Sequence, residues 1–204
     1  MKILGISGSN RKEGNSYLLL KEMFKDVLPV ETKVVQIAEL KVKPCELCFE
    51  SCAQKSFSCV IEDDFRVLFE EMKSADGIVI ACPCYFYIPS KFQALMERIS
   101  CLDYFTEKRH GIGLSPMKGK FCVLMSVSAS GSSFNAFQIL HHLQECVLML
   151  GMRPITTSTW PFIGFSARSG GIERGAILKE KEIIKQAEEL LKLLISEIEK
   201  RKKT

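Results

Sequence analysis

The stretch Gly77-Ile78-Val79-Ile80-Ala81-Cys82 is almost wholly apolar, and it decides the fold class. A strand with one face in water alternates apolar and polar residues, whereas a strand covered on both faces is apolar throughout. This pattern is typical of the middle of a parallel sheet. We therefore expect further strands on both sides of it and helices on both faces.

The rest of the chain supplies those elements in alternation. Short apolar or β-rich runs occupy residues 2–7, 32–38, 121–127 and 153–160. Asn15-Ser16 is expected to cap a helix, and apolar residues recur at helical spacing from there as far as Pro29. The same spacing follows Asp63-Asp64 and extends over 89–101, 134–150 and 178–200. The alternation predicts an α/β fold with a doubly wound, five-stranded parallel sheet in the order 2-1-3-4-5.

Composition narrows the class of protein. Of 204 residues, 47% are hydrophobic and 25% charged, which excludes a disordered or coiled-coil chain. Net charge is only +4 and partly lies in the terminal 200–203 run, so no nucleic-acid partner is expected. Residues 121–144 lack charge but carry serines in their middle, which argues against a membrane span. Without a visible secretory signal we expect a cytoplasmic protein.

We expect a single domain over residues 1–204. Within it, 45–59 forms an irregular cysteine-rich loop inserted after the second strand, and 102–118 forms a polar connection. A Gly-rich loop containing Gly164, Gly170, Gly171 and Gly175 follows the fifth strand, and residues 178–204 form the C-terminal helix. Asp63-Asp64 is expected to cap the helix that follows it.

Ligands of such sheets bind beyond the carboxyl ends of the strands, where the strand order reverses. The first loop there is rich in hydroxyl, amide and glycine residues and opens a helix. Helix N–H groups, the dipole and an arginine suit a terminal phosphate. The candidate phosphate residues are Ser7, Ser9, Arg11, Gly14, Asn15 and Ser16. An ordinary polar turn is the alternative.

Two more loops reach the same edge of the sheet. In the first, three aromatic residues stand between prolines and offer a flat wall for a planar ring. Its candidate residues are Pro83, Cys84, Tyr85, Phe86 and Tyr87. The other loop is small and polar and would let a ring edge approach the backbone; it contains Ser128, Ala129, Ser130 and Gly131. Taken alone, each loop also has an ordinary structural explanation.

Nine cysteines are present, and four of them fall within fifteen residues. These are Cys45, Cys48, Cys52 and Cys59, with the spacing C-x2-C-x3-C-x6-C. Four neighbouring thiolates repel one another unless a cation holds them, which favours a [4Fe–4S] cluster. Zinc, or no metal at all, remains open. The other five lie in strand and helix patterns or beside them and are expected as small buried residues: Cys82, Cys84, Cys101, Cys122 and Cys146.

Several motifs resemble one family. The pattern Gly-Ser-x-Arg-x-x-Gly-Asn-Ser at residues 8–16 is similar to the phosphate loop of flavodoxin-like NAD(P)H-dependent FMN reductases. The segments Ala75-Asp76-Gly77-Ile78-Val79-Ile80, Pro83-x-Tyr85-Phe86, Cys59-Val60-Ile61-Glu62-Asp63-Asp64 and Gly151-Met152 resemble the same family. The cysteine cluster points to its iron–sulfur flavoproteins. Those usually have two residues between the second and third cysteine, where this chain has three.

The resemblance implies FMN in the three loops. With FMN there, we expect Cys84 to lie beside the flavin. It further implies NAD(P)H or a ferredoxin as electron donor and a homodimer or homotetramer. Because the flavin carries the hydride chemistry, no catalytic side chain is nominated. Two other functions stay open: a metal-free NAD(P)H-dependent FMN, quinone or azo reductase, and a zinc-stabilised, non-catalytic flavin-binding or sensor protein.

Overall fold

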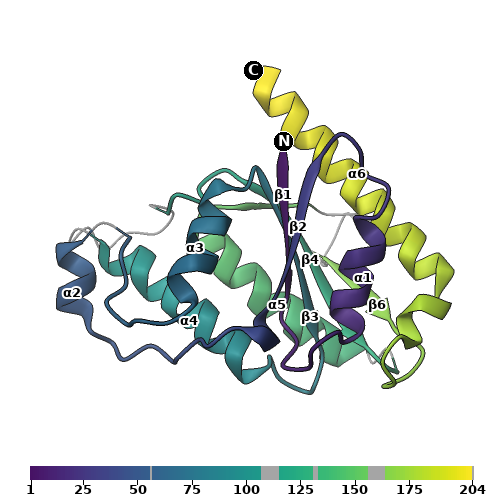
Figure 1. The fold of residues 1–204 in the computed structure, drawn as a ribbon, viewed down its shortest axis with the longest axis horizontal. Coiled ribbons are helices and arrows are strands. Elements are labelled where there is room, and N and C mark those ends of the chain that lie inside the picture. Colours follow the sequence, from purple (N-terminus) through teal and green to yellow (C-terminus); the bar gives the residue numbers. More distant parts are fainter. Residues whose placement is uncertain (56, 107–114, 131–132, 156–163, 204) are drawn as a thin grey trace.

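A parallel sheet runs through the centre of the molecule, as Figure 1 shows. The computed structural model describes residues 1–55, 57–106, 115–130, 133–155 and 164–203. The main path of the sheet has the order β2-β1-β3-β4-β5, as the sequence predicted. Its strands are β1 (Lys2–Ser7), β2 (Glu31–Gln36), β3 (Gly77–Pro83), β4 (Phe121–Ser128) and β5 (Arg153–Pro154).

Helices cover both faces of the sheet (Figure 1). One face packs against α1 (Asn15–Met23) and α6 (Lys181–Lys203), and the other against α3 (Phe65–Ser74), α4 (Ser90–Phe105) and α5 (Ser133–Met149). Side chains of β1 alternate between them: Ile3 joins the first core, whereas Leu4 and Ile6 join the second. Shorter elements are η1 (Ile37–Glu39), α2 (Phe49–Gln54) and η3 (Ala176–Lys179). No helix of the described segments is long and apolar enough to cross a membrane.

The edge position beside β4 differs from the prediction. A separate strand, β6 (Phe165–Arg168), pairs in parallel with the last four residues of β4, while β5 pairs with Phe121 and Cys122. We had placed 165–168 in the Gly-rich loop. Only Ala167 of this strand is fully buried, so its short edge pattern lacks the apolar run that identified β3. Residues 156–160 of the predicted fifth strand lie outside the described segments.

Three predicted helix boundaries were also wrong. Helix α1 ends at Met23, and Leu28, which we had assigned to it, is exposed. Helix α4 continues to Phe105 because Leu102 extends the apolar spacing, so the predicted connection at 102–118 begins too early. The C-terminal α-helix begins at Lys181 rather than at residue 178, where η3 makes a tighter turn.

The predicted capping residues have other roles. Asn15 and Ser16 do not cap α1, whose N-cap is Gly14 without a side-chain bond. Asp63 accepts the Phe65 N–H at 3.0 Å, which agrees in part with capping. The Asp64 carboxylate instead accepts the N–H of Lys41 at 2.7 Å and ties the preceding segment to α3.

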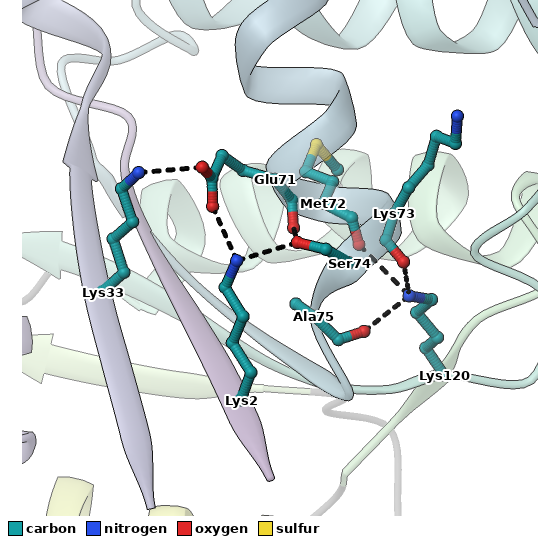
Figure 2. Close-up of polar contacts among 8 residues, drawn as sticks. All are labelled: Lys2, Lys33, Glu71, Met72, Lys73, Ser74, Ala75 and Lys120. Atoms are coloured by element: carbon teal, nitrogen blue, oxygen red, sulfur yellow. Dashed lines mark hydrogen bonds and ion pairs between the residues drawn. The ribbon is translucent and has the colours of Figure 1, made fainter.

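The amino-terminal end of the sheet is held by a polar network, shown in Figure 2. Glu71 of α3 accepts bonds from Lys2 of β1 and Lys33 of β2, each at 2.9 Å. Lys120 donates to three carbonyl oxygens at the end of α3, those of Met72, Lys73 and Ala75. These bonds satisfy acceptors that a helix C-terminus leaves free. They fix α3 at the end of the sheet opposite the predicted ligand loops.

Candidate functional site

Backbone hydrogen bonds draw the loops at the carboxyl ends of the strands together. The Gly8 N–H donates to the Ala81 carbonyl oxygen at 2.9 Å, just beyond the β1–β3 pairing. The Cys84 N–H likewise donates to the Val127 carbonyl oxygen at 2.9 Å. The sheet thus extends into its loops, which keeps the first two predicted loops in a fixed relation to β4.

These loops surround a cavity of about 150 Å³. Most of the residues predicted to hold a ligand line it, together with four that were not predicted. The lining consists of Ser9, Arg11, Gly14, Asn15, Ser16, Pro83, Cys84, Tyr85, Val127, Ala129, Ser169, Gly171 and Ile172. The structure therefore brings all three predicted loops to one site.

The part of the cavity beside α1 has the features of an anion site. The first N–H groups of an α-helix have no partner within the helix, and the dipole is positive there. The hydroxyl oxygen of Ser16, which lines the cavity, is buried without a hydrogen-bond partner in the described part of the chain. The Ser7 hydroxyl is also buried and unpartnered, but Ser7 does not line the cavity. At Gly14, a Cβ would lie 3.1 Å from Ser9 Oγ, so a side chain would crowd this wall. Free donors in a tight cradle fit the phosphate end of FMN.

A fourth loop, which follows β6, completes the cavity and was missed. The Ser169 N–H donates to the Ser128 carbonyl oxygen at 2.8 Å, which extends the β4–β6 pairing. Arg11 Nη1 donates to the Ile172 carbonyl oxygen at 2.8 Å, so the predicted phosphate arginine also supports this loop. The glycines at 170 and 171 were a usable signal, because a loop after an edge strand reaches the same end of the sheet.

The three aromatic residues lie mainly on the surface. Tyr85 is 52%, Phe86 73% and Tyr87 82% exposed. Phe86 has a φ of 69°, a left-handed conformation that is rare for an aromatic residue. Tyr85 borders the cavity beside α1, whereas Phe86 and Tyr87 border a second cavity of about 340 Å³ that also reaches Gln138 and His142 of α5. The aromatic loop therefore stands between two cavities.

The remaining predicted loop residues are placed less uniformly. Ser128 is buried, and Ala129 lines the cavity. Ser130 is exposed and does not line it. Gly131 lies outside the described residues.

The four clustered cysteines lie between β2 and α3. We expected this segment to be irregular throughout, but it contains α2, and Cys52 of this helix is buried in the core. Burial is the largest cause that raises the pKa of Cys52 to about 11, and the neighbouring sulfur atoms of Cys48, Cys59 and Cys45 contribute to the rise. The four sulfur atoms are therefore electrostatic neighbours. Among the described residues, however, no three His, Cys, Asp or Glu side chains are arranged as ligands of one metal ion.

Helix α4 forms hydrogen bonds with the cysteine segment at both of its ends. The Cys45 N–H donates to Glu97 at 3.2 Å, and Arg98 Nη2 donates to Cys59 Sγ at 3.1 Å. Cys101 is only half-buried, contrary to the prediction, as is Cys84. Burial and a hydrogen bond with Cys45 are among the causes that raise the pKa of Cys101 to about 12. Cys82, Cys122 and Cys146 are buried, as predicted.

Comparison with known proteins identifies the family. Residues 1–165 match the family of NADPH-dependent FMN reductases. The chain belongs to this family. The family resemblance inferred from the sequence motifs is confirmed. Family membership makes the protein an NAD(P)H-dependent FMN oxidoreductase.

Two proteins similar to this chain are named iron–sulfur flavoproteins. One, from Methanocaldococcus jannaschii, is 31% identical over 145 residues, which are 70% of each chain. Another, from Methanosarcina thermophila, is 35% identical over 147 residues, covering 69% of this chain and 71% of the relative. The NAD(P)H:quinone oxidoreductase of Methanothermobacter marburgensis has the same fold, with a TM-score of 0.62 at 10% identity over 93% of this chain and 94% of that chain.

Proposed function

We propose that this reductase is an iron–sulfur flavoprotein that moves electrons between a reduced donor and an acceptor through FMN and a [4Fe–4S] cluster. Bound FMN supplies hydride and single-electron chemistry, and a cluster supplies one-electron transfer. The nicotinamide donor follows from the family. A ferredoxin as alternative donor and a cytoplasmic location are further parts of the proposal.

FMN is proposed to bind at the cavity beside α1. Ser7, Ser9, Arg11, Asn15 and Ser16 would hold its phosphate, supported by the free N–H groups of the helix. The unpartnered hydroxyl of Ser16 in the cavity lining supports this placement, since buried polar groups are otherwise paired.

Pro83 to Tyr87 and the loop at 128–131 would hold the isoalloxazine ring. Tyr85 lies at the edge of the cavity and offers a ring face for stacking. The loop at 169–172, which lines the same cavity, would form a further wall of the site. No side chain is assigned an acid or base role.

Cys45, Cys48, Cys52 and Cys59 are proposed as the cluster ligands. The observation that carries this proposal is the electrostatic proximity of the other three sulfur atoms to the buried Cys52 thiol. Burial raises the pKa of the Cys52 thiol, and binding a metal would release its proton. The names of the relatives in two methanogens support the same assignment.

An anaerobic preparation tests the proposal. Iron, acid-labile sulfide, zinc and FMN are measured on one sample of the full chain, and an absorption spectrum is recorded. We expect four irons and four sulfides per chain, as a [4Fe–4S] cluster requires. Serine variants of each of the four cysteines should lose iron, whereas Cys122→Ser, in the core of β4, should keep it.

Cys101 provides a sharper comparison because it lies beside Cys45. We expect Cys101→Ser to retain iron. Loss of iron in this variant with retention in Cys52→Ser would assign the fourth ligand to α4 instead. Flavin without iron in the wild-type chain would contradict the cluster and leave the reductase.

A metal-free FMN, quinone or azo reductase is the second candidate. It is supported by the family matched over residues 1–165, which is described as NADPH-dependent FMN reductase. One zinc per protein chain and no iron would instead support the zinc-stabilised alternative. The same elemental measurement therefore separates all three.

We also propose that the protein forms a homodimer or homotetramer. The exposed aromatic residues of the 85–87 loop and Phe137 of α5 support an additional protein surface over them, because large exposed aromatic groups mark interfaces. Light scattering of the holoprotein tests this. A monomeric mass would contradict it.

A further inference from the structure

Arg98 of α4 is among the largest fully buried side chains of the protein. Its side chain is 1% exposed and forms an ion pair with Asp63, which is 2% exposed, with Nη1 and Oδ2 2.5 Å apart. A buried guanidinium is costly unless it is paired and hydrogen-bonded. The chain therefore commits a charged group to the interior directly beside the cysteine segment.

The hydrogen bonds of Arg98 connect the two ends of the cysteine segment. Nη1 also donates to the Lys43 carbonyl oxygen at 3.4 Å. Nη2 donates to Cys59 Sγ at 3.1 Å and to the Ile61 carbonyl oxygen at 3.3 Å. One planar group thus contacts both flanks of the segment, just before Cys45 and just after Cys59. A lysine could not make these contacts, since it lacks the fixed fork of the guanidinium.

Two further observations describe the surroundings of the Arg98 guanidinium. Its Cζ lies 4.1 Å from the ring centroid of Phe65, so the guanidinium stacks on the first residue of α3. Its Nε is buried and has no hydrogen-bond partner among the described residues. One donor is therefore available to an acceptor that a bound group brings.

We propose that Arg98 is a positioning residue for the iron–sulfur site, which holds the Cys59 ligand in place and makes the bound cluster easier to reduce. The inference rests on the cluster function proposed above. Hydrogen bonds to the ligand sulfur atoms and the local charge are two factors that set cluster potentials. A cation at Cys59 stabilises the added negative charge of the reduced form, and Asp63 limits this effect by neutralising the cation.

The test compares midpoint potentials of the full-length holoprotein, measured by an anaerobic redox titration followed by absorbance and electron paramagnetic resonance. Arg98→Gln should lower the reduced-to-oxidised ratio at a fixed potential about tenfold, which is a shift of about 59 mV for one electron. Asp63→Asn should shift the potential in the opposite direction, because it leaves the cation unneutralised. Arg98→Lys should fall between wild type and Arg98→Gln. Arg66→Gln, at an exposed arginine of α3, should leave the potential unchanged.

Opposite shifts from the two members of one ion pair are not expected from structural damage alone. If Arg98→Gln does not fold, a raised potential in Asp63→Asn still supports the inference, and an unchanged one overturns it. Full iron content at the wild-type potential in both variants also overturns it. A wild-type chain without iron would refute the cluster function itself, which is a different result from iron-loaded variants with unaltered potentials.

Discussion

Asn15 in the first turn of α1 and Gly175, 160 residues later, are joined by a hydrogen bond from the Gly175 N–H to Asn15 Oδ1 at 3.0 Å. The amide of Asn15 also donates to the Glu173 carbonyl oxygen at 3.0 Å and the Gly171 carbonyl oxygen at 3.4 Å. One side chain therefore anchors the loop after β6 to the start of α1, where the FMN phosphate is proposed to bind.

Replacing Asn15 should loosen that anchor. We expect Asn15→Ala to lower the free energy of unfolding by about 1–3 kcal/mol, since it leaves backbone groups of the 171–175 loop without partners. FMN affinity should fall as well, because the loop forms one wall of the cavity. Urea unfolding and a flavin fluorescence titration measure the two effects. Asn10→Ala removes an exposed bond to Ser90 and is the matched control.

Arg11 should contribute directly to flavin binding. Its guanidinium borders the cavity and is held by the Ile172 carbonyl oxygen. Loss of a hydrogen bond to a charged group costs about 1.5–3 kcal/mol, so Arg11→Ala should raise the Kd for FMN roughly 10- to 150-fold. Lys12→Ala, which removes an adjacent exposed charge, should have little effect. Equal affinities of the Arg11→Ala variant and wild type would place the phosphate elsewhere.

Gly8 should tolerate no side chain without a rearrangement of α4. A Cβ at this position would lie 3.0 Å from Cγ of Phe92, which is fully buried. We expect Gly8→Ala to lower the free energy of unfolding by about 1–3 kcal/mol through overpacking. Combining it with Phe92→Leu should recover part of the loss. Thermal unfolding of the two variants measures this, and additive losses would argue against the contact.

Glu71 should make stability depend on pH at the opposite end of the sheet. Hydrogen bonds from Lys2 and then Lys33 lower the pKa of its carboxyl group (Figure 2). The ionised form therefore stabilises the fold above the unfolded pKa of about 4.3, and the contribution is lost as pH falls through the lower folded value.

The comparison of wild type with Glu71→Gln measures this contribution. The difference in free energy of unfolding should be about 0.5–1 kcal/mol at pH 6–7 and should shrink below roughly pH 4. Glu70→Gln removes a more exposed partner of Lys73 and should give a smaller difference. A difference that persists unchanged at pH 3 would assign the effect to packing.

The sheet was predictable because its signal is local. The apolar run at β3 and the alternation of strands with helices leave few topologies, and the simplest of these is the observed order of the main path. The three ligand loops follow from that order. The edge strand β6 was missed because only Ala167 of its four residues is fully buried. A short edge strand carries too little periodic pattern to be separated from the neighbouring glycines.

The details of the sites depend on contacts distant in sequence. Asn15 is of a residue type that often caps helices, yet its side chain forms hydrogen bonds with a loop 156 to 160 residues away. Arg98 lies on a helix whose pattern gave no sign of a buried cation, and its partner Asp63 was interpreted as a helix cap. The four clustered cysteines were identified from spacing, but Cys101 joined their surroundings only through the packing of α4.

Helix α4 contacts both proposed cofactor loops. Phe92 packs against Gly8 in the phosphate loop, and Arg98, six residues later, bonds Cys59. Six residues of α-helix rise about 9 Å, so one rigid element sets the spacing between the two loops. If loading of one cofactor orders this helix, the affinities for FMN and for the cluster are coupled, and by linkage each enhances the other by the same factor. Purified protein that has lost one cofactor should then bind the other more weakly.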